Sequence, residues 1–194
     1  MKAVTWQGRR KVEVRSVPDA RIEQPTDVLV EVTTTGLCGS DLHLYEVLGA
    51  FLDEGDILGH EAMGIVRETG SAVHALAPGE RVIVPFNLSC GTCFMCGRGL
   101  QSQCETTQVR AYGTGAALFG YTKLYGQVPG GQAELLRVPF GNTLPVAVPH
   151  GPPTLHTPPT PWLESAVQAP FRCPVTFTAV SRHTARAWRH AVTT

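Results

Sequence analysis

The chain has 194 residues, enough for one ordinary domain with an appendage. Its 16 basic and 16 acidic side chains give a formal net charge of zero, which provides no electrostatic case for binding nucleic acid or an anionic membrane. No apolar run approaches the ~20 residues of a membrane span, and the N-terminal segment lacks the apolar stretch of a secretory signal. The six cysteines therefore indicate a reducing compartment, and we expect a cytoplasmic protein whose cysteines bind metal instead of forming disulfides.

The composition changes near residue 140. Residues 1–140 hold 18 of the 20 glycines and 15 of the 16 acidic residues, whereas residues 141–194 hold 9 of the 15 prolines and no lysine. We expect one folded domain over residues 1–140 and a loose, proline-, histidine- and arginine-rich tail over residues 141–194, because such a composition cannot pattern a helix or strand for long. An out-of-frame translation of a GC-rich coding stretch, a premature stop and a genuine short variant would each produce such a tail.

Residues 1–140 are predicted to be mainly β. Residues 27–33 alternate, with Val28, Val30 and Val32 on one face, as in a half-buried strand. In chain order, the other expected elements are strands at residues 1–10 and 11–15, a short helix at 38–46, and strands at 62–69, 81–86 and 133–138. Many short strands separated by glycine and proline favour a barrel or a sandwich.

The predicted helix opens with a hexapeptide that bears three chemically useful side chains. Cys38 is a candidate thiolate ligand for a metal. Ser40 can pass a substrate hydroxyl proton towards His43, whose usual pKa suits a relay near neutral pH. The same hexapeptide would serve equally well as a simple helix cap.

A histidine–glutamate pair precedes the strand expected at residues 62–69. A lone histidine is more often packed than ligating, but Gly59 and Gly64 flank this pair, as a sharp turn into a strand requires. His60 can offer one imidazole nitrogen to zinc, and Glu61 can act as a neighbouring carboxylate that tunes or briefly ligates the metal.

The third motif is a run of cysteines at spacings of two, two and seven residues, formed by Cys90, Cys93, Cys96 and Cys104. Four buried structural thiols are a weak alternative, because three cysteines at even short spacing are rare by chance. In the bacterial ferredoxin run the fourth cysteine follows after three residues and precedes proline, whereas here seven residues intervene and Glu105 follows. The run therefore predicts a structural zinc held by four thiolates.

No dinucleotide-binding fingerprint is found in the sequence. The nearest candidate is Gly113 and Gly115, but the third glycine is Gly120 and not position 118 as the fingerprint requires, and no strand leads into the segment. We interpret it as a glycine-rich loop.

Taken together, the Cys38–Gly39–Ser40–Asp41–x–His43 pattern, the glycine-flanked His60–Glu61 pair and the cysteine run resemble the zinc-containing medium-chain alcohol dehydrogenases. Residues 38–45 and 119–121 are similar to the glutathione-independent formaldehyde dehydrogenase-like branch. The resemblance covers residues 1 to about 140 and implies a GroES-like, partly open β-barrel with short helices and a zinc-binding lobe. It implies that Cys38 and His60 ligate the catalytic zinc beside Glu61, that Ser40 and His43 form the proton relay, and that the cysteine run holds the structural zinc.

The resemblance also implies an activity and its partners. Family members oxidise an alcohol or an aldehyde hydrate, pass the hydride to NAD(P) bound by a Rossmann domain, and are usually homo-oligomers. This sequence contains no Rossmann fingerprint, and a further zinc ligand expected shortly after residue 140 is not recognisable, although Cys173 and Glu164 are candidates. The alternative is a non-catalytic zinc-binding fragment of a truncated dehydrogenase.

Overall fold

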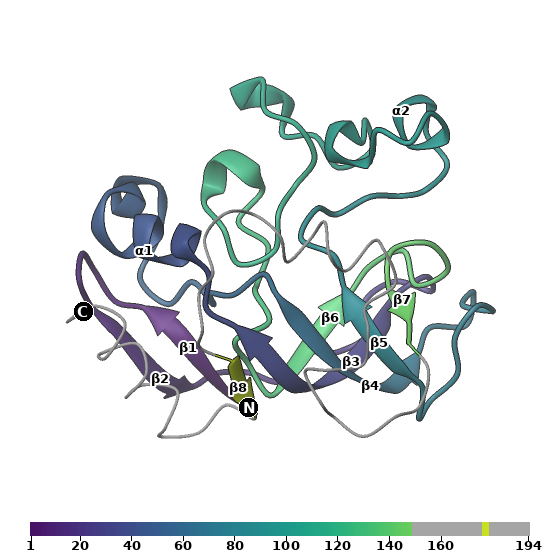
Figure 1. The fold of residues 1–194 in the computed structure, drawn as a ribbon, viewed down its shortest axis with the longest axis horizontal. Coiled ribbons are helices and arrows are strands. Elements are labelled where there is room, and N and C mark those ends of the chain that lie inside the picture. Colours follow the sequence, from purple (N-terminus) through teal and green to yellow (C-terminus); the bar gives the residue numbers. More distant parts are fainter. Residues whose placement is uncertain (149–175, 179–194) are drawn as a thin grey trace.

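The computed structural model describes residues 1–148 and a short strand at residues 176–178 (Figure 1). The remainder of the predicted tail, including Cys173 and Glu164, lies outside the described residues. The predicted domain boundary at residue 140 stays a prediction, and the described residues run eight positions past it. None of the helices in the described part of the chain has the length and apolar character needed to cross a membrane.

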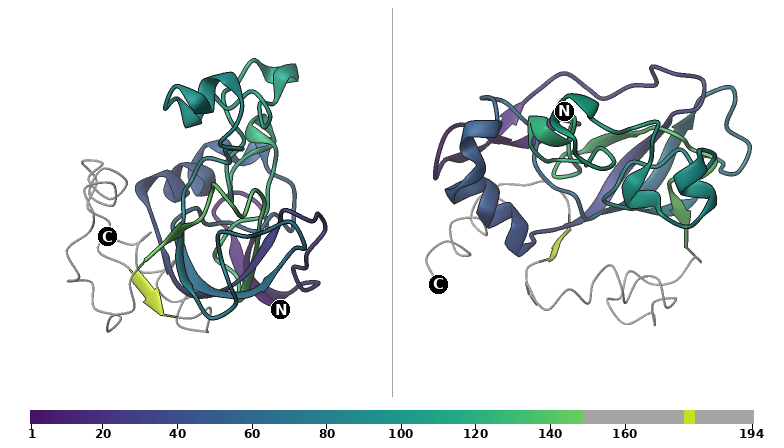
Figure 2. Two further views of the ribbon diagram at one scale, coloured as in Figure 1. Left: turned by 90° about the vertical axis from the view of Figure 1, so that its right-hand side faces the viewer. Right: turned by 90° about the horizontal axis from the view of Figure 1, so that it is seen from above.

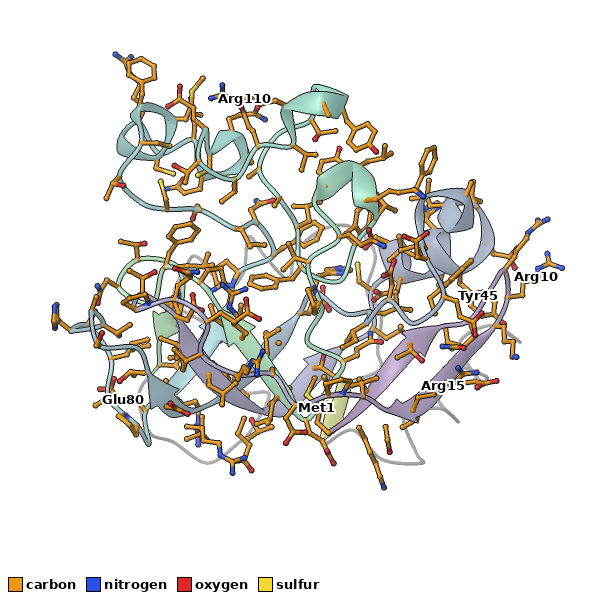
Figure 3. All side chains as sticks on the ribbon, turned by 180° about the vertical axis from the view of Figure 1, so that it is seen from behind. Met1, Arg10, Arg15, Tyr45, Glu80 and Arg110 are labelled. Atoms are coloured by element: carbon orange, nitrogen blue, oxygen red, sulfur yellow. The ribbon has the colours of Figure 1, made fainter. Side chains whose placement is uncertain are left out.

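The N-terminal residues form a two-stranded antiparallel sheet from β1 (Lys2–Trp6) and β2 (Val12–Ser16). Four of the five β1 side chains are buried, and isolated bridges join this strand to Ile57 and Ala133. At the turn between the two strands, the Tyr45 hydroxyl donates to the Arg10 carbonyl at 2.6 Å, and both residues are labelled in Figure 3. This contact fixes the hairpin against the helix that follows Cys38.

The larger sheet has six strands and is open. Its path runs β6 (Leu135–Val138), β3 (Val28–Gly36), β4 (Ala62–Thr69), β5 (Arg81–Val84) and β7 (Val146–Ala147). The sixth strand, β8 (Thr176–Thr178), pairs with the far end of β3, where β6 no longer reaches. The mainly β and incompletely closed architecture expected from the sequence is confirmed.

Aliphatic side chains that alternate along the strands form the core of this sheet. The fully buried ones are Val28, Val30, Val66, Val82, Leu136 and Val138. Each such side chain contributes roughly 1.5–3 kcal/mol when it leaves water, so the alternation seen in residues 27–33 determines which face of β3 points inward. The predicted strand at 62–69 coincides with β4, whereas β6 begins two residues later than expected.

Short helices connect the strands. The predicted helix is α1 (Gly39–Glu46), and it continues into the 3₁₀ helix η1 (Leu48–Phe51). A second segment, with α2 (Phe94–Gly97) and η2 (Gln101–Gln103), projects away from the sheet (Figures 1 and 2). The 3₁₀ helices η3 (Arg110–Tyr112) and η4 (Lys123–Tyr125) follow on the way back to β6.

Candidate metal centres

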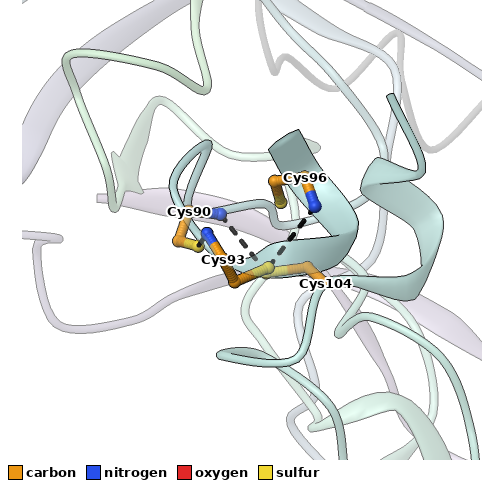
Figure 4. Close-up of side chains that lie close together, drawn as sticks. All are labelled: Cys90, Cys93, Cys96 and Cys104. Carbon is orange, nitrogen blue, oxygen red and sulfur yellow. Dashed lines mark hydrogen bonds between the residues drawn. The ribbon is translucent and has the colours of Figure 1, made fainter. Parts of the chain in front are cut away.

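The four cysteines of the run lie together in residues 90–104, which we call the cysteine lobe. The Sγ atoms of Cys90, Cys93, Cys96 and Cys104 all lie within 4.8 Å of one another (Figure 4). The Cys93 and Cys104 sulfurs are 3.9 Å apart, far beyond the ~2.05 Å of a disulfide. A tetrahedral zinc with Zn–S bonds of about 2.3 Å separates its sulfur ligands by about 3.8 Å. The cysteine lobe therefore fits one zinc ion.

Local backbone geometry brings these sulfurs together. Cys93 is the N-cap of α2, and its Sγ accepts a hydrogen bond from the Cys96 N–H at 3.5 Å. The Cys90 Sγ accepts from the Cys93 N–H at 3.3 Å. η2 ends directly before Cys104, whose Sγ accepts from the Cys90 N–H at 3.4 Å. The backbone thus directs N–H donors at sulfur, an arrangement that stabilises thiolates.

The four sulfurs do not share one electrostatic environment. Burial raises the pKa of Cys90, but hydrogen bonds from Thr106, Thr92 and Cys93 outweigh it and lower the pKa to about 5. The pKa of Cys96 is raised to about 12, first by burial and then by the neighbouring Cys93. Negative charges on crowded thiolates repel, and a divalent cation among them reverses that cost. The donor set is therefore suited to a metal.

The second metal-ligand set is Cys38, His60 and Glu61, whose ligand atoms also lie within 4.8 Å of one another. Cys38 lies between β3 and α1, and the other two residues lie directly before β4. The Gly36 N–H donates to the Glu61 carbonyl at 2.9 Å, so the antiparallel β3–β4 pairing brings the two segments together. The structure thus assembles three residues that the sequence placed in separate motifs.

Two glycines make this approach possible. Gly59 has φ of +99°, and a Cβ there would lie 2.6 Å from the backbone nitrogen of Gln132. A Cβ at Gly36 would overlap the Oε2 of Glu61 and lie 3.1 Å from its Cβ. Glycine is needed at Gly59, for backbone conformation and for close packing, whereas at Gly36 a side chain would displace the Glu61 carboxylate.

A further residue, Asp41, lies beside His60 of this set, and the sequence analysis assigned it no role. Its carboxylate is fully buried, and Oδ2 accepts a hydrogen bond from the Cys38 N–H at 2.8 Å. Oδ1 lies 3.5 Å from His60 Nδ1, and neither atom has a hydrogen-bond partner in the described part of the chain. Burial raises the pKa of Asp41 to about 7. With Nδ1 facing Asp41, the Nε2 atom of His60 is left to face Cys38 and a metal.

A recognisable signal for Asp41 did exist in the sequence. It is the third residue of α1, and it forms a reciprocal capping box with Cys38 at the N-cap. The reading of the hexapeptide as a metal site and its reading as a helix cap are therefore compatible, because one segment does both.

Ser40 and His43 have different surroundings. The Ser40 Oγ lies 3.4 Å from the Cys38 sulfur and 3.1 Å from His60 Nε2, directly beside the ligand atoms. The His43 side chain is exposed and makes no side-chain hydrogen bond to any residue among 1–148. The structure brings Ser40 to the metal set but does not join it to His43, so the relay between them stays a prediction.

Aromatic rings cover one side of the set, and the sequence interpretation did not identify them as a group. The His60 and Phe86 ring centroids are 4.5 Å apart, and Tyr121 meets Phe86 edge-on at 5.9 Å. The pKa of Tyr121 is raised, first by burial and then by the charges of Tyr125, Asp41 and Cys38. Phe86 and Tyr121 come from loops after β5 and before η4, and no short motif links them.

Comparisons with known proteins agree with this geometry. Residues 24–149 match the family model described as the alcohol dehydrogenase GroES-like domain. An uncharacterized zinc-type alcohol dehydrogenase-like protein of Bacillus subtilis is 51% identical over 142 residues, which cover 73% of this chain and 37% of that protein. A glutathione-independent formaldehyde dehydrogenase of Pseudomonas aeruginosa is 37% identical over 149 residues, which cover 73% of this chain and 36% of that protein.

A solved structure gives the same result. The alcohol dehydrogenase TADH from Thermus sp. ATN1 superposes with a TM-score of 0.69 at 38% identity, covering 77% of this chain and 40% of that one. The chain spans between 32% and 47% of the length of the curated relatives that it matches. The similarity therefore concerns one part of those larger proteins.

Proposed function

Because the chain belongs to the alcohol dehydrogenase GroES-like domain family, we propose that it is the metal-binding catalytic portion of a zinc-dependent alcohol or formaldehyde dehydrogenase. The substrate in this proposal is a small alcohol or an aldehyde hydrate, and the compartment is the cytoplasm. The observation that carries the proposal is the Cys38, His60 and Glu61 set, with the buried Asp41 behind His60.

Each residue of the set has a role in the proposed chemistry. Zinc supplies a Lewis acid that lowers the pKa of an alcohol oxygen. Cys38 and His60 hold the metal, and Asp41 orients His60 by facing its Nδ1. Ser40 Oγ lies beside both ligand atoms, so it can accept a hydrogen bond from a substrate hydroxyl and pass that proton on only as its own proton leaves for a base, the role this proposal gives to His43. Glu61 provides a second negative charge next to the metal.

The hydride acceptor in this proposal is NAD(P), for which the described residues offer no site. All pairings between named strands are antiparallel in residues 1–148 and 176–178, whereas dinucleotides bind to parallel βαβ units. Gly113 ends η3 in a left-handed conformation, which is consistent with a glycine-rich loop.

A non-catalytic zinc-binding module is the second candidate function. It is favoured by the same antiparallel topology of the described residues. The two candidates differ in one respect: only a catalytic site leaves a metal position open to substrate.

Cobalt spectroscopy of the 194-residue chain tests this difference. Cobalt substituted for zinc reports its ligands through d–d bands, and a short-chain alcohol added to an open site should shift those bands. We expect a shift that is lost in Cys38→Ser and retained in Cys96→Ser. A chain whose cobalt bands do not respond to alcohol, with metal bound at Cys38, would contradict the catalytic proposal and favour the module.

A further inference from the structure

Two threonine hydroxyl groups approach one of the four sulfurs in the cysteine lobe. Thr106 Oγ1 donates to Cys90 Sγ at 3.1 Å, and Thr92 Oγ1 lies 3.6 Å from the same sulfur. The neighbouring Thr107 hydroxyl donates to the Leu88 carbonyl at 2.7 Å, and the Thr107 side chain helps to lower the pKa of a different sulfur, that of Cys104. Thr106 therefore provides the shortest hydroxyl contact to a cysteine of the lobe in the described residues.

The backbone after the last cysteine places Thr106 there. The N–H groups of Thr107 and Gln108 both donate to the Cys104 carbonyl, at 3.3 and 3.1 Å. This tight turn directs the Thr106 side chain back to Cys90, at the start of the lobe. In the other direction, the Cys90 N–H donates to the Cys104 sulfur. One hydrogen bond to sulfur thus joins the first and last cysteines directly, and a second joins the first cysteine to Thr106, which follows the last one by two residues.

We propose that Thr106 is a positioning residue of the four-thiolate metal site, which closes the lobe between its first and last ligands and makes the Cys90 thiolate less nucleophilic than it would be without the Thr106 hydroxyl. A hydroxyl that donates to a thiolate forms a charge-assisted hydrogen bond and withdraws electron density from the sulfur. The nucleophilicity of a thiolate falls when its electron density falls. This inference rests on the proposal that the cysteine lobe holds zinc.

The test compares cobalt-loaded variants in a Cys38→Ser/Cys173→Ser background, so that the four cysteines of the lobe are the thiols left to give sulfur-to-cobalt charge transfer. Thr106→Val should move the charge-transfer band to lower energy and speed metal loss in iodoacetamide about tenfold, the lower end of what partners of metal ligands contribute. Thr106→Ser should restore both values. Thr92→Val should show a smaller change, because its hydroxyl is farther from the sulfur.

Thr114→Val is the matched control. Its hydroxyl donates to the Leu124 carbonyl at 2.8 Å, so the variant loses a hydrogen bond of similar strength without touching sulfur. We expect the parent spectrum and rate. Thr106→Ala, measured alongside, keeps the proposal testable if Thr106→Val does not fold.

The possible failures are distinguishable. If the parent shows no four-thiolate cobalt spectrum, the metal site itself is wrong and the role of Thr106 falls with it. If the parent shows that spectrum and Thr106→Val or Thr106→Ala shares its band energy and alkylation rate, the site stands and the role of Thr106 is overturned.

Discussion

The cysteine lobe and the Cys38, His60 and Glu61 set are built in opposite ways. The lobe takes all its ligands from one segment, whose first and last cysteines are 14 residues apart. The second set draws on two segments, and Ser40 meets His60 across 20 residues and a β3–β4 pairing. The lobe is closed by its own short helices, whereas the second set depends on the large sheet.

The difference shows which site can exist without the rest of the fold. A local site needs little loop closure, and four thiolates fill every position around zinc. The second set offers fewer ligand candidates in the described residues and includes the exposed Glu61. We expect mild chelation to remove metal from the second set first and to leave the lobe occupied.

The largest expected effect comes from removing ligands from the lobe. The double variant Cys90→Ser/Cys104→Ser should lose about one equivalent of zinc per chain, because two hydroxyls replace two of the four thiolates. Elemental analysis of the purified protein measures this directly. Unchanged zinc content would contradict the lobe as a metal site, and Cys38→Ser should retain the lobe zinc.

The next largest expected effect is on the stability of the fold and comes from substituting Gly59, the residue before His60 of the second set. Gly59→Ala should lower the free energy of unfolding by about 3 kcal/mol, since it combines a strained positive φ with overlap onto Gln132. Gly79→Ala is the matched control, because Gly79 has a similar φ of +94° and open space around it. We expect about 1 kcal/mol for the control. Equal losses in urea unfolding would show that packing beneath His60 is not tight.

A substitution of Asp41 compares the second set with the cysteine lobe by their metal affinities instead of by the stability of the fold. Asp41→Asn removes the charge that faces His60 Nδ1, while the new side chain can still accept from the Cys38 N–H. We expect metal affinity at the second set to fall about 10- to 100-fold, as for other partners of ligating histidines. Competition with a chelator measures it, and the lobe in the same molecule is the internal control. An equal loss at both sites would indicate a general fault in folding.

The contrast between a lobe built from one segment and a second set built from two segments also explains which features the sequence predicted. The spacing of the cysteines almost dictates the lobe, because short loops leave the sulfurs few other arrangements. The alternation in residues 27–33 predicted β3 and its buried face. The sequence predicts the cysteine run, Cys38, His60 and Glu61 as metal ligands, and the structure brings them together as two candidate metal-ligand sets.

The parts that were missed depend on contacts between distant segments. Asp41 is part of the sequence motif around Cys38, but its burial against His60 arises only when β3 and β4 pair. Phe86 and Tyr121 meet through loops that have no periodic pattern. Ser40 and His43 are three residues apart on α1, yet only Ser40 faces the ligand atoms, because the helix turns His43 towards solvent.

The smallest expected effect tests how closely the two segments of the second set approach. At Gly36→Ala the three atoms nearest to the new methyl group all belong to Glu61, and the nearest of them is the mobile end of the carboxylate. The side chain can rotate away at a cost of about 1 kcal/mol, so metal affinity at this set should fall about fivefold while stability changes little.

A double-mutant cycle isolates that contact. In a Glu61→Ala background the carboxylate is gone, and only the Cβ of residue 61 remains near the new methyl group, at 3.1 Å. Gly36→Ala should then cost almost nothing further in metal affinity, which gives an interaction energy close to the whole single-variant effect. If the two losses simply add, Gly36 does not control the Glu61 carboxylate. In that case the close approach of β3 and β4 serves the sheet and not the metal set.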